Sequence, residues 1–282
     1  MEIVTLIENL VYKGELRSEH GLSFLIKTEE CKILFDVGQT GTIVHNAEIL
    51  EEDLSDVDYI ILSHGHYDHT GGLEKVLEVN KTAKIIMKRK ALQKKYSNTT
   101  GTMREIGFKL MDKYKEYPNE FLIIEENLNI NENIEVITTI DNHTDFEKNG
   151  KNLFVKEGES YVEDKFQDEL FLIIKKYDKL NIITGCSHNG IINIIKTAMN
   201  KTKIDCINLV LGGMHLSSLN IKNEALQKIS DRKIQKTVEE LKKLNIDKIY
   251  TNHCTGIDGF MKLKNELRDK IFYSYTGFKI NL

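Results

Sequence analysis

The sequence predicts an α/β protein that contains two β-sheets with helices packed on them. Strand-like segments rich in Ile, Leu, Val and Phe form one group near the start of the chain and a second group in its middle. Helical patterns follow each group, so strands and helices come in blocks and do not alternate singly. This order favours a two-sheet α/β sandwich over a singly alternating βαβ chain.

Each predicted element has a pattern of its own. The first group of strands is expected at residues 2–12, 21–28 and 31–38, and the second at residues 135–140, 152–157, 169–177 and 180–185. Helices are expected at residues 71–80, 190–200 and 233–245. In the last of these, Ile234, Val238, Leu241 and Leu244 recur at helical spacing, which predicts one buried stripe.

Nothing in the sequence divides the chain. No linker rich in Gly, Ser or Pro and no low-complexity stretch occurs in the 282 residues, so a single domain spanning residues 1–282 is expected. Residues 88–120 are charged and have the least regular pattern, and we predict that they form a helical insertion or lid.

Composition narrows the classes of function. A formal net charge of -4 gives no electrostatic reason to expect a nucleic-acid partner or an anionic membrane surface. The start of the chain does not resemble a signal peptide, and no run approaches the ~18 apolar residues of a spanning helix. The four cysteines form no C-x-x-C pair and fit reduced thiols. We therefore expect a cytoplasmic protein with a small-molecule substrate; a homodimer is compatible with the sequence but has no visible basis in it.

Histidines follow four apolar, strand-like runs. The runs lead into His64, His188, His215 and His253. Ligands of open α/β sheets bind outside the carboxyl ends of the strands, so this repetition points to a shared functional edge. His20 and His45 lack this context and are expected to be surface or packing residues.

The densest cluster is the stretch IILSHGHYDHTGG at residues 60–72. Side chains two residues apart, His64 and His66, point the same way in an extended segment and can bind one metal. Asp68 and His69 are neighbours on a turning backbone and must diverge, which suits a second metal. Imidazole together with carboxylate favours zinc, manganese or iron over calcium or magnesium.

This stretch resembles the H-x-H-x-D-H motif of the metallo-β-lactamase superfamily. ILFDVG, with Asp36, is similar to the strand and aspartate that precede the motif in those proteins. Further blocks resemble one branch that includes archaeal dihydropterin ribofuranosylaminobenzene phosphate synthases: EHGLSFLI, TDFE, DKFQDELFLI, TGCSHNGIIN, LGGMHL and NHCTG. The resemblance runs from Glu19 to the C-terminus and is weakest over residues 88–120.

The resemblance implies a four-layer αββα sandwich, with two mixed sheets flanked by helices and a site for two divalent metal ions. Zinc is the expected ion, with manganese or iron as alternatives. By resemblance, His64 and His66 bind the first metal. Asp68, His69 and His253 bind the second.

The remaining ligand of the first metal is open. In this chain Cys186 stands where many members have a bridging aspartate, and His188 follows it. His188 is the preferred ligand; His143, in TIDNHTDFE, is the alternative because it has the order of the usual third-motif histidine. Cys186 is either a thiolate ligand or a small buried residue at a strand end.

The implied reaction is hydrolysis by a metal-bound hydroxide of an ester, lactone, thioester or phosphodiester in a small, anionic metabolite. Asp68 is expected to bind metal and orient the hydroxide, and His215 to meet substrate or the leaving group. A transferase or synthase using the same two-metal site for a pterin-type condensation is the alternative. A nuclease is disfavoured by the acidic net charge and the lack of a basic appendage.

Overall fold

The computed structural model describes residues 1–110, 113–147, 152–217 and 224–282, and the chain divides into two compact units. Unit 1 comprises residues 1–125, 150–169 and 275–282; unit 2 comprises residues 126–149 and 170–274. No helix among the described residues is both long enough and apolar enough to cross a bilayer.

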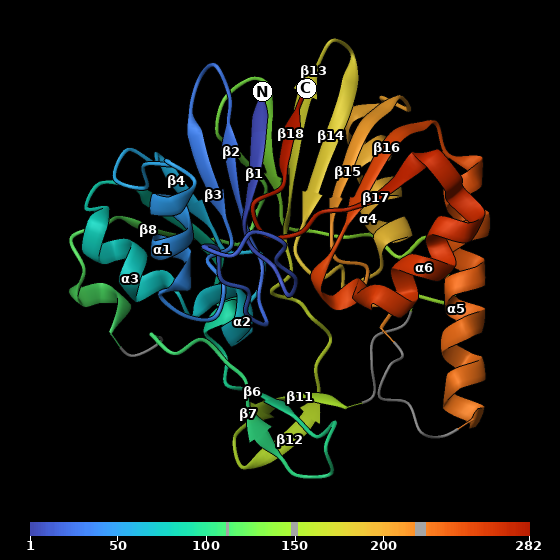
Figure 1. Cartoon of the computed structure of the whole chain (residues 1–282). Coiled ribbons are helices and arrows are strands. Elements are labelled where there is room, and N and C mark those ends of the chain that lie inside the picture. Colours follow the sequence, from blue (N-terminus) through green and yellow to red (C-terminus); the bar gives the residue numbers. More distant parts are fainter. Residues whose placement is uncertain (111–112, 148–151, 218–223) are drawn as a thin grey trace. The chain divides into compact units, whose positions relative to one another are not determined.

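Unit 1 is built on a seven-stranded mixed sheet (Figure 1). In spatial order its strands are β18 (Lys279–Asn281), β1 (Glu2–Ile7), β2 (Ser23–Lys27), β3 (Lys32–Phe35), β4 (Tyr59–Ile61), β5 (Lys84–Lys88) and β8 (Phe121–Ile124). The pairs from β18 to β3 are antiparallel, and those from β3 to β8 are parallel. The parallel pairs place the ends of β3 and β4 side by side at one edge of the sheet.

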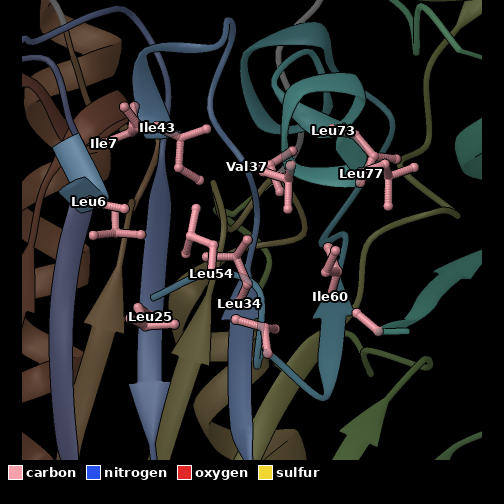
Figure 2. Close-up of a cluster of buried hydrophobic side chains, with 14 of the residues drawn as sticks. Leu6, Ile7, Leu25, Leu34, Val37, Ile43, Leu54, Ile60, Leu73 and Leu77 are labelled. Atoms are coloured by element: carbon pink, nitrogen blue, oxygen red, sulfur yellow. The ribbon is translucent and has the colours of Figure 1, made fainter. Parts of the chain in front are cut away.

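Helices cover one face of this sheet. They are α1 (Thr42–Ile49) and α3 (Leu73–Val79), whereas the short helix α2 (Tyr67–Thr70) belongs to the loop between β4 and α3. Figure 2 shows Leu6, Leu25, Leu34 and Ile60 of the strands beside Ile43 of α1 and Leu73 and Leu77 of α3. All of these side chains are fully buried. Their removal from water, at about 25 cal/mol per Å² of apolar surface, stabilises the sheet–helix layer that carries the loop after β4.

Unit 1 also contains a small antiparallel sheet. Its strands are β12 (Ser160–Glu163), β11 (Leu153–Glu157), β6 (Lys95–Ser97) and β7 (Arg104–Glu105). Single turns of 3₁₀ helix lie at Arg89–Leu92 and Tyr114–Glu116. The prediction of a helical segment at residues 88–120 is therefore wrong for its described part; residues 111–112 lie outside it. Ladder hydrogen bonds between β6 and β11 outweigh the helix propensity of the Lys- and Met-containing sequence.

Unit 2 contains the second seven-stranded mixed sheet. Its strands, in spatial order, are β17 (Ile271–Tyr273), β16 (Ile246–Thr251), β15 (Ile207–Gly212), β14 (Lys179–Thr184), β13 (Phe171–Lys176), β10 (Ile134–Ile137) and β9 (Leu128–Asn129). The four strands from β17 to β14 run parallel, and the rest are antiparallel. The predicted strand at residues 152–157 belongs to the small sheet of unit 1 and not to this one.

Three helices pack on the second sheet: α4 (Ile191–Thr202), α5 (Glu224–Lys243) and α6 (Gly256–Leu267) (Figure 1). The stripe predicted from helical spacing is confirmed, because Ile234, Val238 and Leu241 are buried in the core and Leu244 packs against it. The three parallel strands β14, β15 and β16 end at the same edge of this sheet. Each is followed by a segment that contains a predicted histidine.

Candidate metal-binding sites

The first donor group lies in unit 1 and comprises His64, His66, Asp68 and His69. The chain leaves β4 at Ile61, reaches His64 three residues later, and forms the short helix α2 from Tyr67. All four side chains are buried although all are polar. Buried polar side chains are expected to be hydrogen-bonded or bound to a metal, so their arrangement decides what they do.

Asp36 organises this group from the end of β3. Its φ of 58° lies in the left-handed region, which is uncommon for residues other than glycine, and its side chain is fully buried. One carboxylate oxygen accepts the Ser63 N–H at 2.7 Å, and the other accepts the Ser63 hydroxyl at 2.7 Å and contacts Nδ1 of His69 at 2.6 Å. The Ser63 hydroxyl lies 2.8 Å from Nδ1 of His64. With Nδ1 of both rings held in this way, Nε2 is the nitrogen through which each ring can bind a metal.

The distances within the group suit metal ligands. Nε2 of His64 and Nδ1 of His66 lie 3.0 Å apart. Two nitrogens bound to one tetrahedral zinc lie about 3.3 Å apart, because each bond is about 2.05 Å long. Nε2 of His69 and a carboxylate oxygen of Asp68 lie 3.9 Å apart. The residues therefore fit the divalent ions that the resemblance implies, with His64 and His66 as one pair and Asp68 and His69 as another.

Burial favours the neutral form of the His64 and His66 imidazoles. Burial, followed by the positive charge of Lys95, lowers the pKa of His66 to about 3. Burial also holds the pKa of His64 well below its usual value, and the neighbouring His69 and His66 act in the same direction. A neutral imidazole has the lone pair that a metal ion needs, so these rings need not lose a proton before binding.

A buried ion cluster supports the backbone between the two histidines. The carboxylate of Asp168 accepts the Gly65 N–H at 2.7 Å. Lys95 of β6 is 1% exposed, and its Nζ lies 2.9 Å from Asp168 and 2.6 Å from Asp164. Burial opposes charging of Lys95, but the two carboxylates outweigh it and raise the pKa of Lys95. The small sheet is thus fastened to the His64–His66 backbone through Asp168.

A cavity of about 480 Å³ adjoins Tyr67, the residue between His66 and Asp68. Three cations line it, Lys94, Arg104 and Lys109, together with the single acidic residue Glu105. The Arg104 guanidinium lies 5.7 Å and the Lys109 ammonium 5.8 Å from the centre of the Tyr67 ring. These are cation–π distances, and the cavity is positively charged overall.

The second donor group lies in unit 2 and comprises Cys186, His188, His215, His253 and Cys254. It is distributed over three loops that follow the parallel strands β14, β15 and β16. The loops are tied together by backbone hydrogen bonds: Gly213 donates to the carbonyl of Gly185 at 2.8 Å, and Leu216 to that of Cys254 at 3.1 Å. The four predicted strand-end histidines therefore do follow strand ends.

The backbone of this group is strained. Ser187, His215 and His253 have φ of 55°, 48° and 45°, in the left-handed region that non-glycine residues seldom adopt. Such conformations cost about 1–3 kcal/mol each and persist where the surroundings over-determine them, as at functional sites. Ser187, His215 and His253 in unit 2 therefore share left-handed backbone, a feature typical of binding sites, and Asp36 beside the first donor group has it too.

Donor atoms in unit 2 form two overlapping triads. Cys186, His188 and His215 each place one donor within 4.8 Å of the others, and so do Cys186, His253 and Cys254. The His188 and His215 ring centroids lie 4.5 Å apart. Nδ1 of His215 is buried and has no hydrogen-bond partner among the described residues. A buried nitrogen of this kind is suited to a ligand or an ion.

His143 occupies a different place in unit 2. Its backbone N–H donates to the side chain of Asn193 at 2.7 Å, and its Nε2 lies 3.4 Å from the hydroxyl of Thr197, both on α4. None of the groups of three or more potential ligands in the described part of the chain includes His143. The geometry of unit 2 thus favours His188 over His143 as the nitrogen ligand.

Comparison with known proteins tests the resemblance of the sequence to the metallo-β-lactamase superfamily. The family model of the metallo-beta-lactamase superfamily matches residues 17–145. The 7,8-dihydropterin-6-methyl-4-(beta-D-ribofuranosyl)-aminobenzene-5'-phosphate synthase of Methanocaldococcus jannaschii is 30% identical over 98% of this chain and 95% of its own length. The chain belongs to the metallo-β-lactamase superfamily. An uncharacterized protein of the same organism is 34% identical, with 98% of each chain covered.

A solved structure agrees with this membership. Tm1679, a metal-dependent hydrolase of the beta-lactamase superfamily, matches with a TM-score of 0.83 at 29% identity, and the match covers 100% of this chain and 99% of that one. The predicted metallo-β-lactamase fold is confirmed. Members of the superfamily usually bind divalent metals, in keeping with the two donor groups.

Several residues near the donor groups escaped sequence reasoning. His20, expected to be a surface or packing residue, places Nε2 3.2 Å from the carboxylate of Asp68. Asn252 is fully buried, and neither atom of its amide group has a partner among the described residues. Cys254 follows His253 directly, but no sequence motif assigns it a role. Burial raises the pKa of its thiol, but hydrogen bonds from Cys186 and His215 and the nearby His253 outweigh burial and hold that pKa well below its usual value.

Proposed function

We propose that this superfamily member is a metal-dependent hydrolase that acts on a small, anionic metabolite. The observation that carries the proposal is the first donor group, in which two pairs of buried donors lie 3.0 and 3.9 Å apart. One histidine of each pair, His64 or His69, is oriented by Ser63 or Asp36. Burial of these polar side chains and the left-handed backbone of Asp36 both cost folding free energy. A metal ion bound by the four donor side chains accounts for that cost.

The proposed ligands are those implied by the superfamily resemblance: His64, His66, Asp68, His69, His188 and His253. Two divalent ions, zinc in the first instance, are proposed to be held by them. When bound, such ions lower the pKa of a coordinated water toward neutrality and polarise the bond that is cleaved. Asp36 keeps the His69 ring in one orientation, and Asp168 keeps the His64–His66 backbone in place.

Two further residues have proposed roles in handling protons and charge. Asp68, whose carboxylate contacts the His20 ring, is proposed to orient the attacking water as well as to bind metal. His215 is proposed to donate a proton or a hydrogen bond to the substrate or its leaving group through the buried Nδ1 of its half-buried ring.

The charge of the Tyr67 cavity supports an anionic substrate. Lys94, Arg104 and Lys109 outnumber Glu105 among the side chains that line it. A phosphate or carboxylate group would gain charge-assisted hydrogen bonds there, and guanidinium binds such groups in two-pronged fashion. The cavity adjoins Tyr67, between two proposed ligands, so an anion bound in it would lie next to the reacting centre.

A panel of chromogenic phosphodiester, lactone and thioester substrates tests the proposal. Metal-loaded protein should turn over at least one of them, and chelator-stripped protein should not. Arg104→Met should raise KM for an anionic substrate with little effect on kcat. Arg89→Met is the matched control, since Arg89 is exposed, pairs with Glu125 and does not line the cavity. Turnover that survives complete metal removal would contradict the proposal.

A synthase is the second candidate, and one observation favours it. The M. jannaschii relative that covers nearly the whole chain is named a synthase of a dihydropterin–ribofuranosylaminobenzene phosphate compound. The same metal and cation groups would then bind a phosphorylated pterin and assist loss of its leaving group. Failure of metal-loaded protein on every hydrolytic substrate, with condensation of a phosphorylated pterin and an aminobenzene, would favour this reading.

A further inference from the structure

Two thiols meet at the donor edge of unit 2. Cys186 lies two residues beyond β14 and Cys254 three residues beyond β16. Sγ of Cys254 donates to the carbonyl oxygen of Cys186 at 3.4 Å. Both sulfurs and one ring nitrogen of His253 lie within 4.8 Å of one another. Within the described part of the chain, the other two cysteines, Cys31 and Cys206, belong to no such group.

The fold makes room for this pair. A Cβ added to Gly213 would lie 2.4 Å from Sγ of Cys254, which is closer than real Cβ atoms approach. Glycine at position 213 therefore leaves the space that the sulfur occupies. The neighbouring His253 is held at a φ of 45°, so the His253–Cys254 pair is presented on strained backbone. Neither feature is needed if Cys254 is only a small packing residue.

We propose that Cys186 and Cys254 bind a zinc-class divalent ion as thiolates, together with His253. The proposal rests on the proposed metal-dependent function, because it shares His253 with that ligand set. It adds Cys254 as a sulfur donor and chooses the thiolate role for Cys186 over the packing role. Two thiolates balance the charge of a divalent ion, and their protons pass to solvent on binding.

The spacing of the donors is close to that of such a site. Two sulfurs bound to one tetrahedral zinc lie about 3.8 Å apart, because each Zn–S bond is about 2.3 Å long. The observed donors already lie within 4.8 Å. Cys186 also belongs to the triad with His188 and His215, so an imidazole is at hand for the fourth position. Thiolate with imidazole favours zinc, cobalt or cadmium over magnesium and manganese.

Cobalt spectroscopy tests the assignment without any assay of activity. Full-length protein is reduced, stripped of metal and titrated with Co²⁺ alone, while absorbance and bound cobalt per chain are measured. A sulfur-to-cobalt charge-transfer band in the near ultraviolet is expected. Cys254→Ser and Cys186→Ser should each remove roughly half of the band, because each removes one of two thiolate ligands. The double variant Cys31→Ser/Cys206→Ser, the matched control, should keep all of it.

Each outcome separates this inference from the proposed function. Cobalt that binds without a charge-transfer band, or a band that survives in the Cys186→Ser/Cys254→Ser double variant, overturns the thiolate site but leaves metal-dependent hydrolysis standing. Absence of bound cobalt overturns both. Where a variant of Cys186 or Cys254 fails to fold, the wild type and the Cys31→Ser/Cys206→Ser control decide together: a band of equal strength in both supports the site, and a band absent from the wild type or lost in the control overturns it.

Discussion

Replacing Lys95 with methionine is a direct perturbation of the buried ion cluster in unit 1. Lys95 and Asp168 are each 1% exposed, and Asp164 is also buried. Nζ of Lys95 lies 2.6 Å from Asp164 and 2.9 Å from Asp168. Methionine keeps the apolar stem and removes the charge, so two carboxylates lose their common counter-ion without a large change in volume.

The expected loss is large. Removing one partner of a buried ion pair costs about 3–5 kcal/mol, because the remaining charge stays buried without compensation. At roughly 2–4 °C per kcal/mol in a protein of this size, the melting temperature should fall by about 6–20 °C. Lys75→Met is the matched control: Lys75 pairs with Glu78 on the surface, where such a pair contributes about 0–1 kcal/mol.

The pH dependence of the loss identifies its cause. In the wild type burial opposes ionisation of Asp168, but Lys95 and the Gly65 N–H outweigh it and lower the pKa of Asp168, so the stabilisation is present above the unfolded pKa and is lost as pH falls. Without Lys95 the carboxylates bind protons more tightly when folded than when unfolded. The difference in unfolding free energy between Lys95→Met and wild type should therefore shrink from pH 7 to pH 5.

Urea unfolding at the two pH values measures this difference. A loss below about 1 kcal/mol at pH 7 would show that the cluster is not the charged network described here. A loss of the expected size that is the same at both pH values would also refute the reasoning, since it would reflect packing and not uncompensated charge.

Three other perturbations have expected results. Asp36→Asn should weaken metal affinity about 10–100-fold in competition titrations, because Asp36 orients His69 and, through Ser63, His64. Unchanged affinity would show that Asp36 does not orient metal ligands. Gly190→Ala should cost roughly 2–4 kcal/mol in urea unfolding, because φ is 98° and the new Cβ would lie 2.4 Å from Oε2 of Glu147; a cost below about 0.5 kcal/mol would argue against that contact. Leu25→Ala should cost about 2–5 kcal/mol, whereas the same change at the exposed Ile229 should cost less than about 0.5 kcal/mol; equal costs would contradict the assigned core.

Local sequence patterns predicted most of the strands and helices. Alternation and apolar runs placed β2, β3, β13 and β14, because buried strands need continuous apolar sequence whatever their partners. Helical spacing similarly placed the buried stripe of α5. The segment at residues 88–120 was mispredicted because its strand β6 pairs with β11, some 60 residues away, and no local pattern records that pairing.

The candidate site divides in the same way. The histidines after β4, β14, β15 and β16 were found because strand ends can be read locally. Contacts between distant segments cannot be predicted from local patterns. His20 contacts Asp68, which is 48 residues away in the sequence, and Lys95 contacts Asp168, which is 73 residues away. The preference for His188 over His143 likewise depends on the packing of the His143 segment against α4.

Metal content per chain tests the central claim most directly. Protein purified without added metal, and then equilibrated with zinc, is compared with His188→Ala and His143→Ala by elemental analysis. The proposed ligand set predicts two divalent ions per wild-type chain, a loss of bound metal in His188→Ala, and full stoichiometry in His143→Ala, whose ring contacts Thr197 instead. Metal-free wild-type protein, or a loss confined to His143→Ala, would contradict it.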